Sequence, residues 1–366
     1  MLMAHPAPPA LALHLLDAQT IPLTPKAGTN CPSIDRALQG GLSYGQVTAL
    51  EGPRGTGKTL VRPPSLIPCP QRSKPLQLTS PKTYQVALHI LATHLLSSPT
   101  ARAAIIDTRG IHSPPYLLRD VMQARLSGDM GKMEGVLERV QVMRVFDVWG
   151  LCEGVEEVGK GVRGEGTWDE QRVDQKKEVL EIADTEGEDS EFSDSDTKPT
   201  LHHTPLPPST LLLIDLLTPP FTTLMQTSPS LALSLLHTLL RTLRHLTTSH
   251  SLLTLILNSS YLSYDNTSST LSPSVNHSPS IFSTTGSQYR PALGRSFGYC
   301  VDVRVLLSRV MRGGKDAEDR VLGREGGREV SVLEVVGERS GGRGGLWGGW
   351  ECKDGVSLRD AFLQNT

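Results

Sequence analysis

The feature that most constrains this 366-residue chain is a glycine-rich octapeptide of the form GxxxxGK[ST], which follows directly after a short apolar strand at 46–51. The octapeptide consists of Gly52, Pro53, Arg54, Gly55, Thr56, Gly57, Lys58 and Thr59. Glycines in such a loop let backbone N–H groups point at phosphate oxygens. Lys58 would bridge the β- and γ-phosphates, and the Thr59 hydroxyl would ligate Mg²⁺. The pattern predicts a nucleotide site; the alternative is a glycine turn that binds nothing.

The segment that follows the loop breaks this pattern. Residues 61–85 carry six prolines and no hydrophobic periodicity, whereas residues 86–97 (VALHILATHLLS) predict a helix. Joining residue 60 to residue 86 gives one continuous helix after the phosphate loop. We therefore interpret 61–85 as a retained intron or an error in the gene model, with a genuine loop insertion as the alternative. The sequence of the spliced transcript distinguishes the two.

Apolar strands alternate with helical stripes along the rest of the chain. Strand patterns occur at residues 103–107, 140–146, 211–215, 252–257, 300–307 and 329–336. A helix is predicted at 114–126, and a longer one from Pro229 to Leu246 with Ser228 as its cap. This alternation predicts an α/β fold with a mainly parallel sheet and helices on both faces.

A carboxylate ends the most apolar of these strands. Residues 211–214 are Leu-Leu-Leu-Ile, and Asp215 follows them. The second motif of phosphate-loop proteins is a carboxylate at the carboxyl end of a buried strand, facing the Mg²⁺ site. Asp215, acting through water, therefore joins Thr59 in the predicted Mg²⁺ site. Because an apolar strand followed by Asp is common, the prediction depends on its pairing with the phosphate loop.

Charge is unevenly distributed along the chain. The formal net charge is −2, but residues 151–196 hold 16 acidic and 5 basic side chains. This block is poor in apolar residues, which predicts a disordered acidic linker over 151–209. The remainder is mildly basic, which permits contact with DNA without requiring it. The sequence contains no run of 18 apolar residues, which would indicate a membrane span. It also contains no CxxC pair, which would indicate a zinc knuckle.

The acidic linker divides the predicted nucleotide-binding core into two parts. We predict a loose N-terminal tail at 1–28, core segments at 29–150 and 210–340, and a Gly-rich C-terminal tail at 341–366. Residues 339–350 contain glycines, two arginines and two tryptophans. This stretch is interpreted as a flexible hairpin loop, and the alternative is a segment that binds nucleic acid by charge and stacking.

Four passages resemble the RecA-like recombinase family, in particular its eukaryotic recombinase paralogues. Residues 29–48 (TNCPSIDRALQGGLSYGQVT) resemble the family's lead-in to its phosphate loop, and residues 106–110 (IDTRG) its strand-plus-acid motif. Residues 213–221 (LIDLLTPPF) resemble its second nucleotide motif, and residues 290–297 (RPALGRSF) the stretch after its second DNA loop. The last passage, with residues 142–149, is most similar to the D-type paralogue. The resemblance covers about 29–60, 86–150 and 210–312.

The resemblance implies a RecA-like P-loop NTPase that binds ATP and Mg²⁺ and acts in homologous recombination and DNA repair in the nucleus. The implied partners are other recombinase paralogues or the recombinase itself, and single-stranded or branched DNA bound weakly. It places Asn258 where the family has a polar residue that senses the γ-phosphate; a simple strand end is the alternative. Arg290 and Arg295 become candidates for contact with DNA or with a neighbouring subunit's phosphates, against a structural role.

Two departures from the family bear on activity. Its active recombinases place a catalytic Glu where this chain has Arg109, and a cation cannot take a proton from the attacking water. No catalytic residue is assigned for this reason, and any hydrolysis is expected to be slow. The loop 259–289 contains no Lys or Arg, which predicts weak DNA binding through it. Two other functions stay open: a non-catalytic scaffold with a vestigial nucleotide site, and an unrelated phosphate-loop enzyme such as a small-molecule kinase.

Overall fold

The strands of the computed structural model form one large sheet and one small one. The structure describes residues 25–53, 82–109, 114–165, 209–264, 280–282, 287–311, 329–353 and 356–362. The strands are β1 (Lys26–Ala27), β2 (Leu42–Ser43), β3 (Gln46–Pro53), β4 (Arg102–Asp107), β5 (Val140–Arg144), β6 (Thr210–Asp215), β7 (Leu253–Tyr264), β8 (Ser287–Pro291), β9 (Val303–Met311), β10 (Glu329–Glu338), β11 (Trp347–Lys353) and β12 (Ser357–Asp360). The helices are α2 (Pro32–Ala37), α3 (Lys82–Ser97), α4 (Pro114–Arg125), α5 (Met130–Leu137), α6 (Val148–Arg163), α8 (Thr218–Thr227), α9 (Pro229–Ser249) and α10 (Arg295–Cys300).

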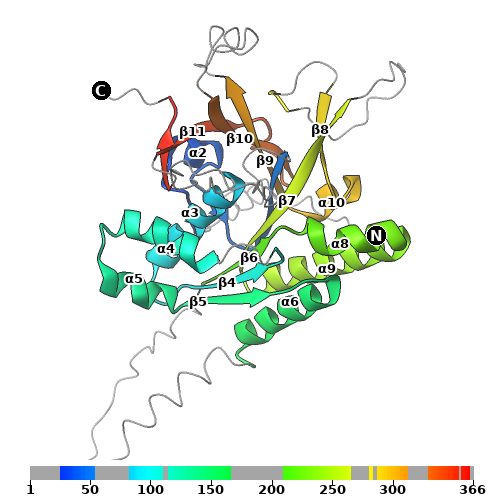
Figure 1. Cartoon of the computed structure of the whole chain (residues 1–366), viewed down its shortest axis with the longest axis horizontal. Helices are drawn as coiled ribbons and strands as arrows, with labels where there is room; N and C mark the ends of the chain where they lie inside the picture. Colours follow the sequence, from blue (N-terminus) through cyan, green and yellow to red (C-terminus); the bar gives the residue numbers. More distant parts are fainter. Residues whose placement is uncertain are drawn as a thin grey trace, which may run out of the picture.

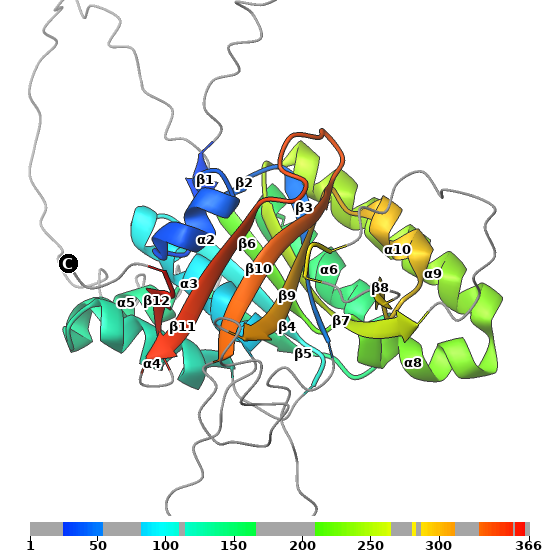
Figure 2. The same ribbon diagram turned by 90° about the horizontal axis from the view of Figure 1, so that it is seen from above.

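Parallel strands make up most of the large sheet. Its order is β12-β11-β10-β9-β3-β7-β6-β4-β5, and β8 pairs with β7 off this path. The strands from β9 to β5 in this order are parallel, whereas β10, β11, β12 and β8 pair antiparallel. Figure 2 shows β11, β10 and β9 side by side across the sheet. The predicted mainly parallel sheet is confirmed, and β7 separates β3, where the phosphate loop begins, from β6.

The parallel strands are apolar because helices cover both of their faces. Alternate residues of β6 belong to two different cores. Leu211 and Leu213 pack in the core that includes α3, α4 and α5, whereas Leu212 and Ile214 pack in the core that includes α6, α8 and α9. Figure 1 shows these two groups of helices on opposite sides of the sheet. None of the helices in the described residues is long and apolar enough to cross a membrane.

Two helices extend into segments that the sequence assigned otherwise. The predicted acidic linker began at residue 151, but α6 continues to Arg163. Leu151, Val155 and Val158 bury one face of this helix, a spacing visible in the sequence beneath the dominant acidic composition. Similarly, α3 begins at Lys82, so that the last residues of segment 61–85 form its first turn. Residues 54–81 and 166–208 lie outside the described residues.

The segment predicted as a Gly-rich tail contains two strands of the large sheet, β11 and β12. A Cβ atom on Gly348 would lie 2.2 Å from the carbonyl oxygen of Ser33 in α2. The Ser33 hydroxyl in turn donates a hydrogen bond of 2.6 Å to the carbonyl of Gly349. Glycine is therefore required here because the backbones of α2 and β11 approach closely. Trp350, two residues further on, is fully buried.

The Gly348→Ala substitution is expected to lower the free energy of unfolding by about 1–3 kcal/mol, because the added methyl group forces α2 away from β11. Urea denaturation measures the change. Gly344→Ala is the matched control, since that glycine is exposed and a Cβ atom there meets nothing within 4 Å. Equal stabilities for the two variants would contradict the close packing of α2 on β11.

Candidate nucleotide site

The polar residues singled out in the sequence come together at the carboxyl ends of the central parallel strands. Gly52 and Pro53 end β3, and their register partners on β7 are Ser259 and Ser260. Asp107 ends β4 and is the register partner of Asp215, which ends β6. Ligands of open α/β sheets bind at this edge. The part of the phosphate loop from Arg54 to Thr59 lies outside the described residues, so the predicted roles of Lys58 and Thr59 remain predictions.

Asp215 is buried and already paired. The Nε and Nη2 atoms of Arg109 donate to its Oδ2 atom at 3.0 and 2.5 Å, and the two side chains are 14% and 4% exposed. The guanidinium carbon of Arg109 lies 5.2 Å from the centre of the Tyr84 ring, which is within the range of a cation–π contact. Arg109 therefore lies against the carboxylate predicted to serve Mg²⁺.

A threonine fixes the backbone around this pair. The Thr108 hydroxyl is 2.8 Å from the carbonyl oxygen of Asp215 and 2.7 Å from that of Leu216. Leu216 has a φ angle of 70°, a left-handed conformation that costs energy for a branched side chain. This strained turn directs the chain from the end of β6 into α8. Thr108 was not among the predicted site residues; the signal in the sequence was its position between Asp107 and Arg109.

Asn258 lies on β7, between the strands that carry the phosphate loop and Asp215. Its side-chain oxygen accepts a hydrogen bond of 2.6 Å from the Thr218 hydroxyl. The residue is 2% exposed, and its Nδ2 atom has no hydrogen-bond partner among the described residues. Buried amide donors are nearly always satisfied, so an unused one beside the end of β3 is consistent with an acceptor supplied by a ligand.

Burial controls the protonation of the site. Desolvation raises the pKa of Asp215 to about 6, an effect that Arg109 opposes and the nearby Asp107 reinforces. Desolvation also raises the pKa of Tyr84 well above its usual value, again with a contribution from Asp215. The Tyr84 hydroxyl therefore stays protonated at neutral pH. Within the described residues, Arg109 is the cation that lies closest to Asp215.

The described residues do not fit a Mg²⁺ ion at Asp215 as they are arranged. Carboxylate oxygens are suitable ligands, but a Mg²⁺ ion requires octahedral geometry at about 2.0–2.1 Å and retains several waters. The guanidinium of Arg109 fills the space beside the Oδ2 atom of Asp215. No group of three or more His, Cys, Asp or Glu side chains suited to a metal ion occurs in the described part of the chain.

The two arginines proposed for DNA contact lie in neighbouring elements beyond β7. Arg290 is half-buried on β8, where its register partner on β7 is Tyr261. Arg295 begins α10. Both follow the loop 259–289, of which residues 265–279 and 283–286 lie outside the described residues. Their contact with DNA remains a prediction.

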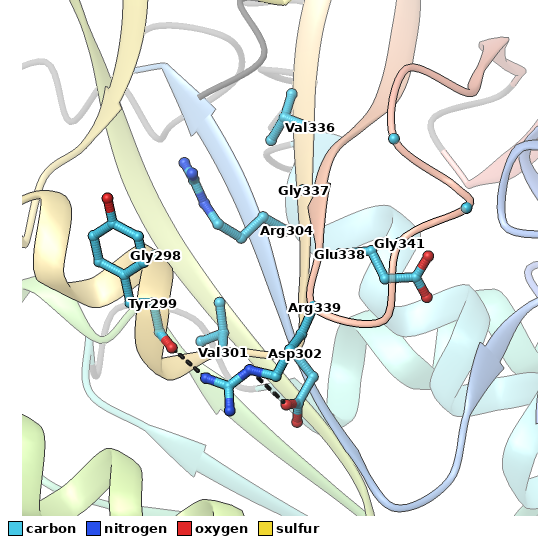
Figure 3. A pocket seen from close by; sticks show the side chains of 12 residues that line it. Gly298, Tyr299, Val301, Asp302, Arg304, Val336, Gly337, Glu338, Arg339 and Gly341 are labelled. Atoms are coloured by element: carbon cyan, nitrogen blue, oxygen red, sulfur yellow. Dashed lines mark hydrogen bonds and ion pairs between the residues drawn. The ribbon is translucent and has the colours of Figure 1, made fainter. Parts of the chain in front are cut away.

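A pocket of about 610 Å³ opens at the opposite end of β3 and β9. Figure 3 shows Arg339 between the carbonyl of Tyr299 and the carboxylate of Asp302. Asp302 also pairs with Arg244 at 3.0 Å, and Arg304 on the pocket wall is bound to Glu51. The charges that line this pocket compensate one another. It lies at the amino ends of the parallel strands and is therefore separate from the nucleotide site.

A buried ion pair links this pocket to the strand that precedes the phosphate loop. Arg304 binds the carboxylate of Glu51 in a bidentate arrangement, with Nε–Oε1 at 3.1 Å and Nη2–Oε2 at 3.0 Å. The side chains are 11% and 1% exposed. This pair was not predicted from the sequence. The signal was a charged residue inside each of two apolar strands, although the sequence does not indicate that the two meet.

Comparison with known proteins shows the fold. No protein-family model matches the sequence, and no curated protein matches it. Among solved structures, a crystal structure of the RadB recombinase is similar, with a TM-score of 0.50 and 17% sequence identity over 92% of this chain and 99% of that chain. The chain therefore has a RecA-like α/β fold, as the sequence predicted. At this identity the likeness extends to the fold alone.

Proposed function

We propose that this chain is an ATP-binding protein of homologous-recombination repair, of the recombinase paralogue type and most similar to the D-type paralogue. The observation that carries the proposal is the joint placement of the β3 end, Asp215 and Asn258 at one edge of a RecA-like sheet. ATP would be held by residues 52–59, with Lys58 on the β- and γ-phosphates. A Mg²⁺ ion accompanying the nucleotide would take the Thr59 hydroxyl as its protein ligand.

The biological setting belongs to the same proposal. The protein would act in the nucleus, in a complex with other recombinase paralogues or with the recombinase itself. Contact with single-stranded or branched DNA, through Arg290 and Arg295, would be weak because the loop 259–289 carries no Lys or Arg. Hydrolysis of ATP would be slow, since Arg109 cannot act as a general base. The support for this setting is the sequence resemblance together with the fold.

Substitution of the phosphate-loop lysine tests nucleotide binding. At about a hundredfold excess of ATP over Kd, binding is expected to stabilise the parent protein by about 2–3 kcal/mol. Lys58→Ala is expected to remove this effect, and a thermal-shift titration with ATP and Mg²⁺ measures it. Lys132→Ala is the control, because Lys132 is 74% exposed on α5 and pairs only weakly with Asp129. An identical ATP response in the parent and the Lys58→Ala variant would refute the proposal.

A non-catalytic scaffold is the second candidate, because Arg109 occupies the carboxylate that a magnesium-dependent ATPase requires. In this case the acidic segment would be the element that binds a partner. Replacing residues 166–208 by a Gly/Ser linker leaves α6 and β6 intact and removes most of the acidic side chains. Loss of paralogue pull-down in this variant, together with no ATP response in the parent, would favour the scaffold.

A further inference from the structure

The arginine beside Asp215 is held from several sides. Its backbone N–H donates to Oδ1 of Asp107 at 3.0 Å, its guanidinium contacts the Tyr84 ring, and Thr108 ties its segment to the end of β6. A side chain that is 14% exposed and fixed in this way is not a mobile surface arginine. Its charge is also permanent, since a guanidinium does not lose its proton in proteins.

A cation in this place has electrostatic consequences for any second cation. Arg109 donates to one oxygen, Oδ2, of the carboxylate that a water-linked Mg²⁺ ion would address. Two cations at one buried carboxylate repel each other strongly, because the effective dielectric constant is low there. The arginine therefore opposes binding of the metal at Asp215 by both volume and charge.

The same side chain has donors left for an anion. Two of its five N–H groups are used on Asp215. For the other three, no hydrogen bond is formed within the described part of the chain. A guanidinium with spare donors at the phosphate-binding edge of the sheet is well suited to phosphate oxygens. Asn258 offers an unused amide donor at the same edge.

We propose that Arg109 substitutes for the divalent cation at this site, so that the protein binds ATP with little dependence on Mg²⁺. This inference rests on the proposed function, because it concerns how the same site neutralises the nucleotide. In this proposal Arg109 positions the nucleotide and compensates the charge of its phosphates. It is not a catalytic residue that has lost its activity. A protein of this kind would keep its nucleotide when free Mg²⁺ is scarce.

The test compares ATP affinity in millimolar Mg²⁺ with affinity in excess EDTA, using the full chain and a fluorescent ATP analogue. For the parent, the two Kd values are expected to agree within about threefold. Arg109→Glu restores a carboxylate and is expected to lose about tenfold or more of its affinity when Mg²⁺ is removed. Arg109→Gln is a second variant, in case a third carboxylate beside Asp107 and Asp215 prevents Arg109→Glu from folding. It is expected to show the same dependence of ATP affinity on Mg²⁺.

The control variant removes a nearby charge without touching Asp215. Arg144→Gln serves here, because Arg144 is 55% exposed and its Nε atom lies 4.0 Å from Oδ2 of Asp107. It is expected to retain the Mg²⁺ independence of the parent. Two results would overturn the inference: a tenfold loss of ATP affinity by the parent in EDTA, or an affinity of Arg109→Gln that depends on Mg²⁺ as little as that of the parent. In either case the proposed binding of ATP would still stand. Absence of binding in both conditions would refute the proposed function itself, and the inference with it.

Discussion

Acidification from pH 6.5 to about pH 4 is expected to lower the free energy of unfolding by about 5 kcal/mol through His89 and His94. Burial lowers the pKa of each histidine from 6.5 to about 4, with Arg125 near His89 and Arg139 near His94 adding to the effect. Well above pH 6.5 the histidines are neutral in the folded and in the unfolded chain, so they contribute no pH dependence there. As the pH falls below 6.5 the unfolded chain takes up protons that the folded chain excludes, so stability decreases until about pH 4.

The hydrogen bonds of the two histidines explain why protonation is unfavourable. The Nε2 atom of His94 is 2.8 Å from the carbonyl of Arg102, and its Nδ1 atom accepts from the Tyr44 hydroxyl at 2.6 Å. In His89, Nε2 is 2.7 Å from the carbonyl of Val356 and Nδ1 accepts from the Arg125 guanidinium at 2.9 Å. In its neutral form each imidazole ring already uses both of its nitrogen atoms in hydrogen bonds. A second proton on His89 would meet the Arg125 guanidinium, which can only donate, and one on His94 would require the Tyr44 hydroxyl to turn from donor to acceptor.

Urea denaturation at a series of pH values measures this dependence. His94→Gln is expected to remove about half of it, since the amide still donates to the Arg102 carbonyl but does not titrate. His237→Gln, an exposed substitution on α9, is the control. Asp215 contributes with the opposite sign between about pH 4 and 6, because its pKa is raised; comparison of variants at equal pH cancels this contribution. Parallel stability curves for the parent and His94→Gln would show that His94 is not buried as a neutral ring.

The Arg304→Met substitution is expected to cost about 3–5 kcal/mol, because it leaves the Glu51 carboxylate buried without its cation. Glu51 is 1% exposed, and within the described residues its carboxylate accepts two hydrogen bonds, both from Arg304. Methionine retains an apolar stem of similar length, so the loss reflects charge more than a cavity. Urea denaturation at neutral pH measures the effect.

A second substitution separates charge from packing at this pair. Adding Glu51→Gln to Arg304→Met removes the uncompensated charge and is expected to recover a large part of the lost stability. Arg163→Ala is the surface comparison, since its pair with Glu165 is 39% and 59% exposed and is worth at most about 1 kcal/mol. If Arg304→Met costs no more than Arg163→Ala, the pair contributes nothing through burial of its charges.

The class of fold and the order of the site residues along the chain could be predicted from residue patterns within short stretches of the sequence. Strands such as β6 are apolar on both faces, and the long stripe of α9 repeats with helical period, so element types were predictable. Parallel strands bring their carboxyl ends to one edge, which is why Asp215 was predicted to lie near the start of the phosphate loop; the resemblance added Asn258 to the same site. The likeness to the RadB recombinase supports this α/β architecture.

Local composition predicted the ends of helices and strands less reliably than hydrophobic periodicity predicted their types. The acidic side chains of 151–163 and the glycines after 341 indicated loops, yet α6 and β11 are both packed elements. In each case the deciding contacts come from elsewhere in the chain. The apolar face of α6 is buried in the second core, and the glycines of β11 are needed because α2 lies against them.

The sequence by itself determined the class of fold, because the types of helices and strands depend on residue patterns at short spacing; the resemblance alone implied that Arg109 stands where active recombinases have a Glu. Only the tertiary structure decided which side chains Arg109 contacts. Arg109 and Asp215 are far apart in the chain, and pairing of β4 with β6 brings them into contact. The same holds for Glu51 with Arg304, which meet because β3 and β9 are neighbours. Such contacts depend on strand order, and strand order is set by the packing of the whole sheet.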